Sequence, residues 1–471
     1  MRLGALTGGG EDSQVTGFAI DHRKVAPGTI FGAFQGARVD GEDFIDDAVK
    51  AGAVAVVARR EARVVGAVHI AADTPRERFA ELAAAYFRPF PATAVAVTGT
   101  NGKTSTVEMT RQLWRMAGLN AASIGTLGVT TADERVATGL TTPDVVTFLA
   151  NVAGLAREGV THLAFEASSH GLTQYRTQGL PVAAAAFTNL SRDHLDYHGD
   201  MAAYLTAKLR LFSEVLSAEG TAVVWADDAE SARVIDLAHA RGNRLITVGT
   251  RGATLRLAAR EPTLLGQRLT IEAEGRSHVV QLPLIGAYQA ANALVAAGLV
   301  IATGGDVATT LGHVARLQPV RGRLERAVIT RIGAPVYVDY AHTPDALEAA
   351  IAALKPHAGG RLVVVFGAGG DRDRGKREAM GQVAVREADR VIVTDDNPRS
   401  EDPAMIRAEV LKGAKGAEEV GDRRAAIATA LAEAGAQDIV LIAGKGHEQG
   451  QIVGDLVLPF DDVTVARDCA A

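Results

Sequence analysis

A short apolar run at residues 93–97 leads straight into the turn Thr98-Gly99-Thr100-Asn101-Gly102-Lys103-Thr104. Its final Gly-Lys-Thr is typical of a phosphate-binding loop: glycine lets backbone N–H groups approach phosphate, lysine supplies a cation and threonine a hydroxyl for Mg²⁺. The common loop has a glycine five positions before the one that precedes lysine, but Val97 stands there and Gly99 comes only three positions ahead. We therefore predict a strand, a shortened phosphate loop and a helix. An ordinary turn with a helix cap is the less favoured alternative.

The helix expected after the loop keeps one apolar stripe, formed by Val107, Thr110, Trp114 and Ala117. The chain has 471 residues, more than one core usually supports, so about two to four domains are expected. Its net charge of −6 offers no basic field for nucleic acid.

The cysteine content and the hydropathy of the chain indicate where in the cell the protein is expected. The only cysteine, Cys469, allows no intrachain disulfide and no cysteine-based zinc site, which fits a reducing cytoplasm. The longest nearly apolar stretch, 290–302, is interrupted by Asn292 and is too short to span a bilayer, and residues 1–10 lack a charged leader with an apolar run. We expect a soluble, cytoplasmic protein without a membrane partner.

Two proline-bearing joints, at 88–91 and 318–322, divide the chain. We expect three α/β domains, residues 1–89, 90–318 and 319–471. In the first, strand-like runs alternate with helices. In the other two, buried strands alternate with helical stretches, which is typical of mostly parallel sheets. The strands expected beyond 93–97 are 29–34, 53–58, 161–166, 183–188, 222–226, 336–340, 361–366, 390–394 and 438–442, and the helices are 44–51, 76–87 and 201–216.

Polar side chains follow two of the expected central strands. Glu166 ends one strand, and the loop after the next contains Asp193, His194, Asp196 and His198. Taken alone, a glutamate at a strand end is often a helix cap, and such a loop can simply be solvated. Because parallel strands end at one edge of a sheet, these side chains are expected beside the phosphate loop, which favours a role for Glu166 as a Mg²⁺ ligand.

Lys208 is unusual for its position. It falls within the apolar stripe of the helix expected at 201–216. A buried lysine is costly unless it is paired or neutral. One interpretation is a lysine that reaches out at the edge of the stripe. The other is that Lys208, deprotonated by burial, adds CO₂ to become a carbamate that ligates a second Mg²⁺ or orients a catalytic group.

Three polar loops follow strands of the last domain, at 370–377, 395–399 and 444–448. The first lacks the third glycine of a dinucleotide fingerprint, because Arg372 stands there, so a NAD site is not expected. Loops at the ends of neighbouring parallel strands form one pocket, and guanidinium groups beside carboxylates suit a zwitterionic ligand. The alternative is exposed loops without a ligand.

Together these motifs resemble the muramyl ligases, the ATP-dependent enzymes that add amino acids to the peptidoglycan precursor. The shortened phosphate loop is specific to their superfamily, which includes the folylpolyglutamate synthetases. The resemblance covers essentially the whole chain and is strongest to members that add the third residue, a diamino acid, to UDP-N-acetylmuramoyl-L-alanyl-D-glutamate. The motifs that carry it are Asp21 to Val25 with Pro27-Gly28, Thr141-Thr142-Pro143, Glu166 to His170, Leu190 to His198, Asp339 to Pro344, Asp396 to Arg399 and Gly444 to Glu448.

The resemblance implies a substrate-binding N-terminal domain, a central ATP-binding phosphate-loop domain and a Rossmann-like C-terminal domain that binds the amino acid. It implies the following roles for residues of this sequence. Catalysis would use Lys103, Lys208, His194 and Glu166, with Mg²⁺ held by Thr104, Glu166, His194 and carbamylated Lys208. ATP would contact Thr98, Gly99, Thr100, Asn101, Gly102, Lys103, Thr104, Asn292, Arg323 and Asp339. The UDP-muramoyl substrate would contact Ile20, His22, Thr141, Thr142, Ser168, Gln174 and Arg176, and the diamino acid Arg372, Asp396, Asn397, Pro398, Arg399, Gly444 and Glu448.

Two positions depart from the family pattern, since His22 replaces a usual serine and Leu140 an often-found asparagine. The contacts to uridine are the least secure part of the transfer. The chemistry implied is transfer of the γ-phosphate of ATP to a carboxylate, followed by attack of an amine on the acyl phosphate. We expect a monomer whose partners are small molecules.

Three alternatives stay open. A folylpolyglutamate synthetase would perform the same chemistry on another acceptor, without the N-terminal module or the Asp-Asn-Pro-Arg loop. A nucleotide-dependent switch would leave Lys208 unexplained. For the diamino acid, Arg399 favours meso-diaminopimelate, whose distal carboxylate a guanidinium can bind, over L-lysine or L-ornithine.

Overall fold

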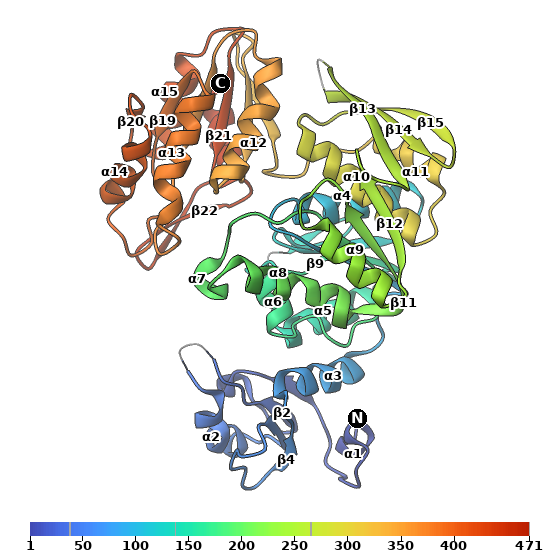
Figure 1. Ribbon diagram of the computed structural model, residues 1–471. Helices are drawn as coiled ribbons and strands as arrows, with labels where there is room; N and C mark the ends of the chain where they lie inside the picture. The colour runs from blue at the N-terminus through green and yellow to red at the C-terminus, as the bar shows by residue number, and fades with distance from the viewer. Residues whose placement is uncertain (37–38, 137, 264–265, 471) are drawn as a thin grey trace.

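The chain folds into three successive α/β units, seen in blue, green and orange in Figure 1. The computed structural model describes residues 1–36, 39–136, 138–263 and 266–470. The main sheets of the three units lie within residues 17–71, 93–282 and 325–443. The α/β class with mostly parallel sheets, expected from the sequence, is confirmed.

The N-terminal unit contains a parallel sheet of order β1-β2-β3-β4. The strands are β1 (Gly17–Ala19), β2 (Thr29–Gly32), β3 (Ala55–Ala58) and β4 (Val68–Ala71), and the helices are α1 (Leu3–Thr7), α2 (Ile45–Lys50) and α3 (Pro75–Phe87). Strands β2 and β3 are buried along their whole length, as expected for a parallel sheet covered on both faces.

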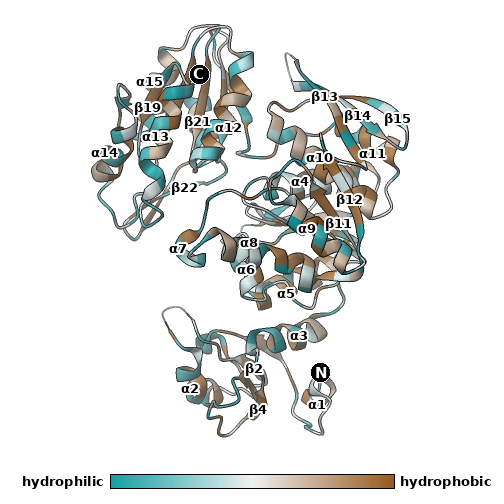
Figure 2. Cartoon of the chain, viewed as in Figure 1, coloured by the Kyte–Doolittle hydropathy of each residue, from teal (hydrophilic) through white to brown (hydrophobic). Residues whose placement is uncertain are grey.

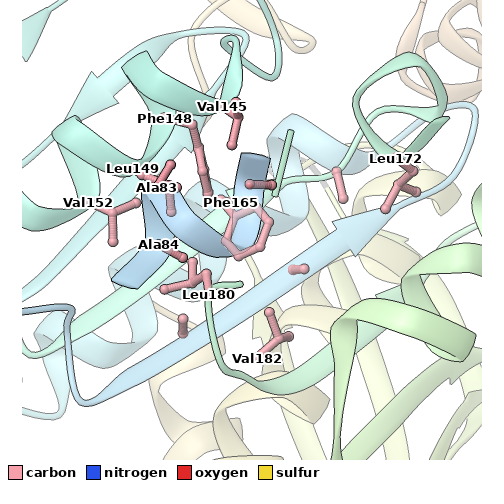
Figure 3. Close-up of a cluster of buried hydrophobic side chains, with 14 of the residues drawn as sticks. Ala83, Ala84, Val145, Phe148, Leu149, Val152, Phe165, Leu172, Leu180 and Val182 are labelled. Carbon is pink, nitrogen blue, oxygen red and sulfur yellow. The ribbon is translucent and has the colours of Figure 1, made fainter. Parts of the chain in front are cut away.

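Helix α3 joins the first unit to the second through a common core. Its buried face, which includes Phe79, Ala83 and Ala84, belongs to the same apolar cluster as Phe148 and Val152 of the middle unit. Figure 3 shows the two alanines in the same cluster of side chains as Phe148 and Val152. A small residue at each point of contact lets the helix backbones approach closely. The first joint is therefore a packed interface.

The middle unit is built on a long sheet of order β15-β14-β13-β12-β11-β10-β5-β9-β6-β7-β8, whose centre from β12 to β6 is parallel. Its strands are β5 (Thr93–Thr98), β6 (Ala121–Gly125), β7 (Gly128–Thr130), β8 (Arg135–Val136), β9 (His162–Glu166), β10 (Val182–Phe187), β11 (Leu216–Trp225), β12 (Arg244–Gly249), β13 (Leu255–Thr263), β14 (Gly266–Ala273) and β15 (Arg276–Leu282). Its helices are α4 (Lys103–Met116), α5 (Val145–Arg157), α6 (Ser169–Thr173), α7 (Leu195–His198), α8 (Met201–Arg210), α9 (Ser231–Ala240), α10 (Ala287–Ala302) and α11 (Val307–Val314).

Successive side chains of β5 point to opposite faces of the sheet, and each face is covered by its own layer of helices. Val95 and Val97 face the core shared with α4 and α10, whereas Ala94 and Ala96 face the core shared with α5 and α9. The central strands are hydrophobic over most of their length (Figure 2). Because β5 and β9 are adjacent and in register, with Val97 opposite Glu166, the phosphate loop and that carboxylate reach the same edge of the sheet.

The C-terminal unit has a sheet of order β16-β17-β21-β18-β19-β20, parallel except for β16. Its strands are β16 (Glu325–Ile329), β17 (Pro335–Asp339), β18 (Leu362–Phe366), β19 (Arg390–Val393), β20 (Glu418–Glu419) and β21 (Ile439–Ala443), with a hairpin of β22 (Gly450–Val453) and β23 (Leu456–Pro459). Helices α12 (Pro344–Leu354), α13 (Gly375–Glu387) and α14 (Pro403–Gly413) cover one face, and α15 (Arg423–Ala432) and α16 (Asp462–Ala470) cover the other.

The helix expected at about 201–216 is confirmed: α8 is followed without a break by a π-helical turn, Leu211–Val215, and Leu216 begins β11. One local expectation was wrong: the apolar stripe expected on α4 does not continue to Ala117, which is exposed, because the helix ends at Met116. Among the described residues, no helix combines the length and apolar character needed to cross a membrane.

Candidate active site between the middle and C-terminal units

The phosphate loop is a tight turn that requires its two glycines. Gly99 (φ 148°) and Gly102 (φ 84°) both lie in the region that favours glycine. A Cβ on Gly99 would come within 1.9 Å of the Thr188 hydroxyl oxygen, and one on Gly102 within 2.3 Å of Asn292 Oδ1. The backbone N–H of Asn101 donates to Asn189 Oδ1 at 2.8 Å, which holds the loop open.

Two lysines meet beneath this loop. Lys103 Nζ donates to the carbonyl oxygens of Gly99 at 2.9 Å and Thr100 at 2.8 Å, and Lys208 Nζ donates to the same Gly99 oxygen at 2.7 Å. Lys208 is only 1% exposed and lies over the ring of Tyr204, 4.2 Å from its centroid. Burial lowers the pKa of Lys103. Burial also lowers the pKa of Lys208 well below its usual value, and the nearby charge of Lys103 acts in the same direction. The burial of Lys208 expected from its stripe is confirmed.

Glu166 is a buried carboxylate beside the loop. Its Oε1 accepts from the backbone N–H of Thr126 at 2.7 Å, and its Oε2 accepts from the Thr126 hydroxyl at 3.2 Å. The Thr126 hydroxyl is in turn 3.1 Å from that of Thr141. Each carboxylate oxygen retains lone-pair capacity for a further partner.

The remaining middle-unit residues expected to contact the UDP-muramoyl substrate adjoin this carboxylate. The Thr142 hydroxyl donates to the Glu166 carbonyl at 2.8 Å and lies 3.0 Å from Ser168 Oγ. Arg176 Nη1 donates to the Thr142 carbonyl at 2.6 Å, and its Nη2 donates to Gln174 Oε1 at 2.8 Å. Four of the expected residues therefore form one hydrogen-bonded group.

Ile20 and His22 lie on the N-terminal unit, apart from that group. Ile20 is 38% exposed, and the ring of His22 stacks on Phe44 with centroids 4.3 Å apart. Neither residue lines the cleft described below. A role for them in holding uridine stays a prediction.

A cavity of about 200 Å³ adjoins the phosphate loop and is lined from both units, by Asn101, Gly102 and Asn292 from one side and Arg323 and Asp339 from the other. Asp339 is buried and accepts backbone N–H bonds from Leu324 at 2.6 Å and Ala341 at 2.8 Å. Burial raises the pKa of Asp339 to about 6.

Arg323 also reaches the end of the phosphate loop. Its Nη2 donates to the Thr104 hydroxyl at 3.1 Å, and its guanidinium stacks over the Tyr340 ring, 4.5 Å from the centroid. Of the loop residues expected to contact ATP, Thr98 is fully buried, and its hydroxyl has no hydrogen-bond partner among the described residues. The cavity is large enough for part of a nucleotide, and the Arg323 side chain lines it from the C-terminal unit.

A cleft of about 1450 Å³ separates the middle and C-terminal units. Residues of the C-terminal unit that are expected to hold the diamino acid line one side of the cleft. Residues of the middle unit that are expected to act on the phosphoryl group or the muramoyl substrate line the other side. The expected residues that line it are Thr141, His194, Arg372, Asp396, Asn397, Arg399, Gly444 and Glu448. His194 has a left-handed backbone (φ 55°), and burial lowers the pKa of its ring to about 4, which favours the neutral form.

Asn397 and Glu448 are fixed by a lysine that the sequence did not single out. Lys445, fully buried, donates from Nζ to Asn397 Oδ1 at 2.9 Å and to Glu448 Oε2 at 3.1 Å, while Asn397 Nδ2 donates to Glu448 Oε2 at 2.7 Å. Gly444 (φ 113°) passes close by, since a Cβ there would lie 2.6 Å from Asp396 Oδ2. Pro398 does not line the cleft, and its carbonyl accepts from the N–H of Glu401.

Other cleft residues also escaped the sequence analysis. His342, which lines the cleft, lies within a motif that had been identified, but a motif does not say which of its side chains face a cleft. His170 and Lys376 also line the cleft. The charged run at 370–377 was the available signal for Lys376.

The Mg²⁺ ligands expected from the sequence, Thr104, Glu166, His194 and carbamylated Lys208, stay a prediction. Within the described residues, no group of three or more His, Cys, Asp or Glu side chains is arranged to hold an ion. Mg²⁺ in nucleotide sites typically takes only one or two carboxylates and completes its shell with phosphate oxygens and water. Glu166 at the edge of the phosphate loop fits that arrangement.

Comparison with known proteins bears directly on this site. The chain matches the family described as "Mur ligase family, catalytic domain" over residues 14–92, "Mur ligase middle domain" over 97–300 and "Mur ligase, glutamate ligase domain" over 322–446. A Zymomonas mobilis protein named UDP-N-acetylmuramoyl-L-alanyl-D-glutamate--2,6-diaminopimelate ligase is 60% identical over 462 residues, which is 97% of this chain and 95% of the relative.

Solved structures agree. One that bears the same enzyme name is 34% identical, covers 100% of this chain and 98% of its own, and has a TM-score of 0.74. The MurF ligase from Thermotoga maritima in complex with ADP is 20% identical, with 98% of each chain covered and a TM-score of 0.64. At that identity the second structure shows the shared fold alone.

Proposed function

Because the chain belongs to the Mur ligase family, we propose that it joins 2,6-diaminopimelate to UDP-N-acetylmuramoyl-L-alanyl-D-glutamate in an ATP-dependent amide ligation of peptidoglycan synthesis. The observation that carries the proposal is the 60% identity over 97% of the chain to a ligase named for these two substrates. The match of residues 14–92 to an N-terminal Mur ligase domain disfavours a folylpolyglutamate synthetase, which does not need that module.

The reaction has two steps. A carboxylate oxygen of the D-glutamyl residue attacks the γ-phosphorus of ATP, the bond to the bridging oxygen breaks, and ADP leaves an acyl phosphate. The neutral amine of the diamino acid then attacks the acyl carbon; the tetrahedral intermediate loses the amine proton and expels inorganic phosphate, and an amide remains.

The first step brings two anions together, so cations must absorb the charge. Lys103, at the start of α4, supplies one, and the helix N-terminus adds backbone N–H donors. Arg323, bonded to Thr104, brings a second cation from the other unit. Because the amino-acid residues lie across the cleft from the phosphate loop, closure of the cleft would bring the amine to the acyl phosphate and exclude water from it.

We propose that Mg²⁺ is held by Glu166 and the Thr104 hydroxyl with ATP, joined by His194 and carbamylated Lys208 at a second site. When bound, Mg²⁺ neutralises charge on the transferring phosphoryl group. The carbamate is supported by the burial of Lys208 and its lowered pKa, since only a neutral amine adds CO₂. The negative charge of a carbamate there would also attract the Lys103 ammonium.

For the third residue, we propose the meso isomer of diaminopimelate, with Arg399 and Arg372 facing its distal carboxylate. We propose that its partners are small molecules; the net charge of −6 offers no basic field for nucleic acid. We further propose that it acts as a cytoplasmic monomer.

ADP release with each acceptor and amino acid tests the proposal. We expect ADP formation only when the UDP-muramoyl dipeptide and meso-diaminopimelate are both present, and little with L-lysine or L-ornithine, which lack the second carboxylate. The L,L isomer serves as the control for stereochemistry. Failure of the dipeptide to stimulate ADP formation with any diamino acid would exclude the ligase assignment, and equal turnover with lysine would exclude the preference for diaminopimelate.

A further inference from the structure

Two of the cations that line the cleft lie on strained neighbouring loops. Arg372 follows β18 and Arg399 follows β19, and both line the cleft. Asp371 (φ 52°) and Arg399 (φ 53°) have left-handed backbones, a conformation that is unfavourable for residues other than glycine. Such loops keep their shape only when the surrounding contacts hold them.

The loops that carry Arg372 and Arg399 are joined by direct hydrogen bonds. The N–H of Gly370 donates to the Asn397 carbonyl at 2.9 Å, and Arg399 Nη1 donates to the Gly370 carbonyl at 2.7 Å. A Cβ on Gly370 would lie 1.9 Å from the Pro398 carbonyl oxygen. The position of each loop therefore determines that of the other.

An ion pair between a buried arginine and a partly buried glutamate holds the two loops together. Arg377 of α13 is 1% exposed and binds Glu401 through two parallel bonds, Nη1 to Oε2 at 3.0 Å and Nη2 to Oε1 at 2.9 Å. Glu401 stands two residues after Arg399, and its Oε1 also accepts the N–H of Asp371 at 2.6 Å. Arg377 Nη2 additionally donates to the Gly369 carbonyl at 3.1 Å.

A second link runs in the opposite direction. Asp371 accepts the N–H of Ser400 at 3.1 Å through Oδ2 and the Ser400 hydroxyl at 2.7 Å through Oδ1. Asp371, next to Arg372, thus binds Ser400, next to Arg399. In the other direction, Glu401 of the second loop binds the backbone of Asp371 in the first. Hydrogen bonds from Arg377 lower the pKa of Glu401 to about 2, so its carboxylate is ionised at any assay pH.

We propose that Glu401, held by Arg377, is a positioning residue for diamino-acid specificity. It fixes the two loops so that the guanidinium groups of Arg372 and Arg399 lie where the distal carboxylate of the diamino acid binds. Glu401 itself lies behind the loops, does not line the cleft and acts only through them. This inference rests on the proposed function, because it requires a ligand with that second carboxylate.

The test compares the steady-state constants of full-length Glu401→Gln with those of the wild type. Glutamine keeps the size of the side chain but loses the charge and one acceptor, while Arg377 retains Glu409, whose Oε2 lies 2.8 Å from Nη1. We expect the KM for meso-diaminopimelate to rise about tenfold or more, which is the loss of roughly one charged hydrogen bond. The KM values for ATP and the UDP-muramoyl dipeptide should stay unchanged, and the preference for diaminopimelate over lysine should narrow.

Asp438→Asn is the matched control. Asp438 is a comparably buried carboxylate in the same unit and pairs with Arg361 at 2.8 Å, but it precedes β21 at the end of the sheet away from the cleft. It should lower the thermal stability and leave all three KM values as they are. Asp371→Asn, at an exposed position where asparagine tolerates the left-handed backbone, removes the charge and one of the two acceptors for Ser400 and should raise the same KM even if Glu401→Gln folds poorly.

The outcomes separate the two proposals. A wild-type protein without diaminopimelate-dependent ADP release refutes the proposed function itself. An active wild type whose Glu401→Gln and Asp371→Asn variants keep the KM for diaminopimelate within twofold refutes the positioning role. Equal rises in all three KM values would show a general structural defect and would overturn it as well.

Discussion

Lys208→Ala is expected to lower the rate of ADP formation by about 10³-fold or more, the loss typical when a preorganised charge-stabilising group is removed from an active site. Lys208 is buried under the phosphate loop and shares the Gly99 carbonyl with Lys103. Short carboxylic acids such as acetate should restore part of the activity, because they can occupy the space of a carbamate and supply its negative charge.

The rescue distinguishes a carbamate from a plain lysine. If Lys208 only holds the Gly99 carbonyl, added carboxylates will do nothing, whereas short alkylamines will restore activity. Lys355→Ala, which removes an exposed lysine of the C-terminal unit, is the control and should keep wild-type activity. Full activity of Lys208→Ala without supplements would remove both roles. Labelled bicarbonate gives an independent readout, since its carbon should appear on the wild-type lysine.

Asp462→Ala should produce the largest loss of stability, about 3–5 kcal/mol, because it leaves a buried guanidinium without its counter-charge. Arg423 and Asp462 are both fully buried and form two parallel bonds of 2.8 Å, from Nε to Oδ1 and from Nη2 to Oδ2. Arg423 also donates to the carbonyls of Ala443 and Asp395, which end β21 and follow β19. In denaturant unfolding of the full-length Asp462→Ala variant, the C-terminal unit should unfold first.

The same two helices provide the control. Arg424 and Asp468 form an exposed pair at 3.3 Å between α15 and α16, and Asp468→Ala should cost less than about 1 kcal/mol. Replacing both buried partners, as in Arg423→Met with Asp462→Leu, should recover most of the stability, because no unpaired charge then remains. Similar losses for Asp462→Ala and Asp468→Ala would contradict this account.

The sequence was most informative where chemistry and local pattern coincide. The apolar run before Thr98 predicted β5, and the altered glycine spacing identified the superfamily. Lys208 stood out because a charge on an apolar stripe violates the helical pattern. In each case the signal lies within one turn or strand of the residue concerned.

Features that depend on distant partners could not be predicted. Arg423 and Asp462 are 39 residues apart, and each is ordinary in its own segment. The charged run around Arg377 resembles a solvated loop until the fold brings Glu401 against it. The antiparallel strands β13 to β15 escaped notice because their buried and exposed residues alternate, so none forms the continuous apolar run of a parallel strand.

The packing of helix α3 makes the first joint of the chain different from the second. Since its side chains fill the core of the middle unit as well as that of the first, the first joint resists bending, and the N-terminal and middle units should travel as one body. Bending is then left to residues 318–322. In the proposed reaction, a nucleotide sugar on the N-terminal unit and ATP on the middle unit would then keep a constant separation, and movement of the C-terminal unit would bring the amine to the acyl phosphate.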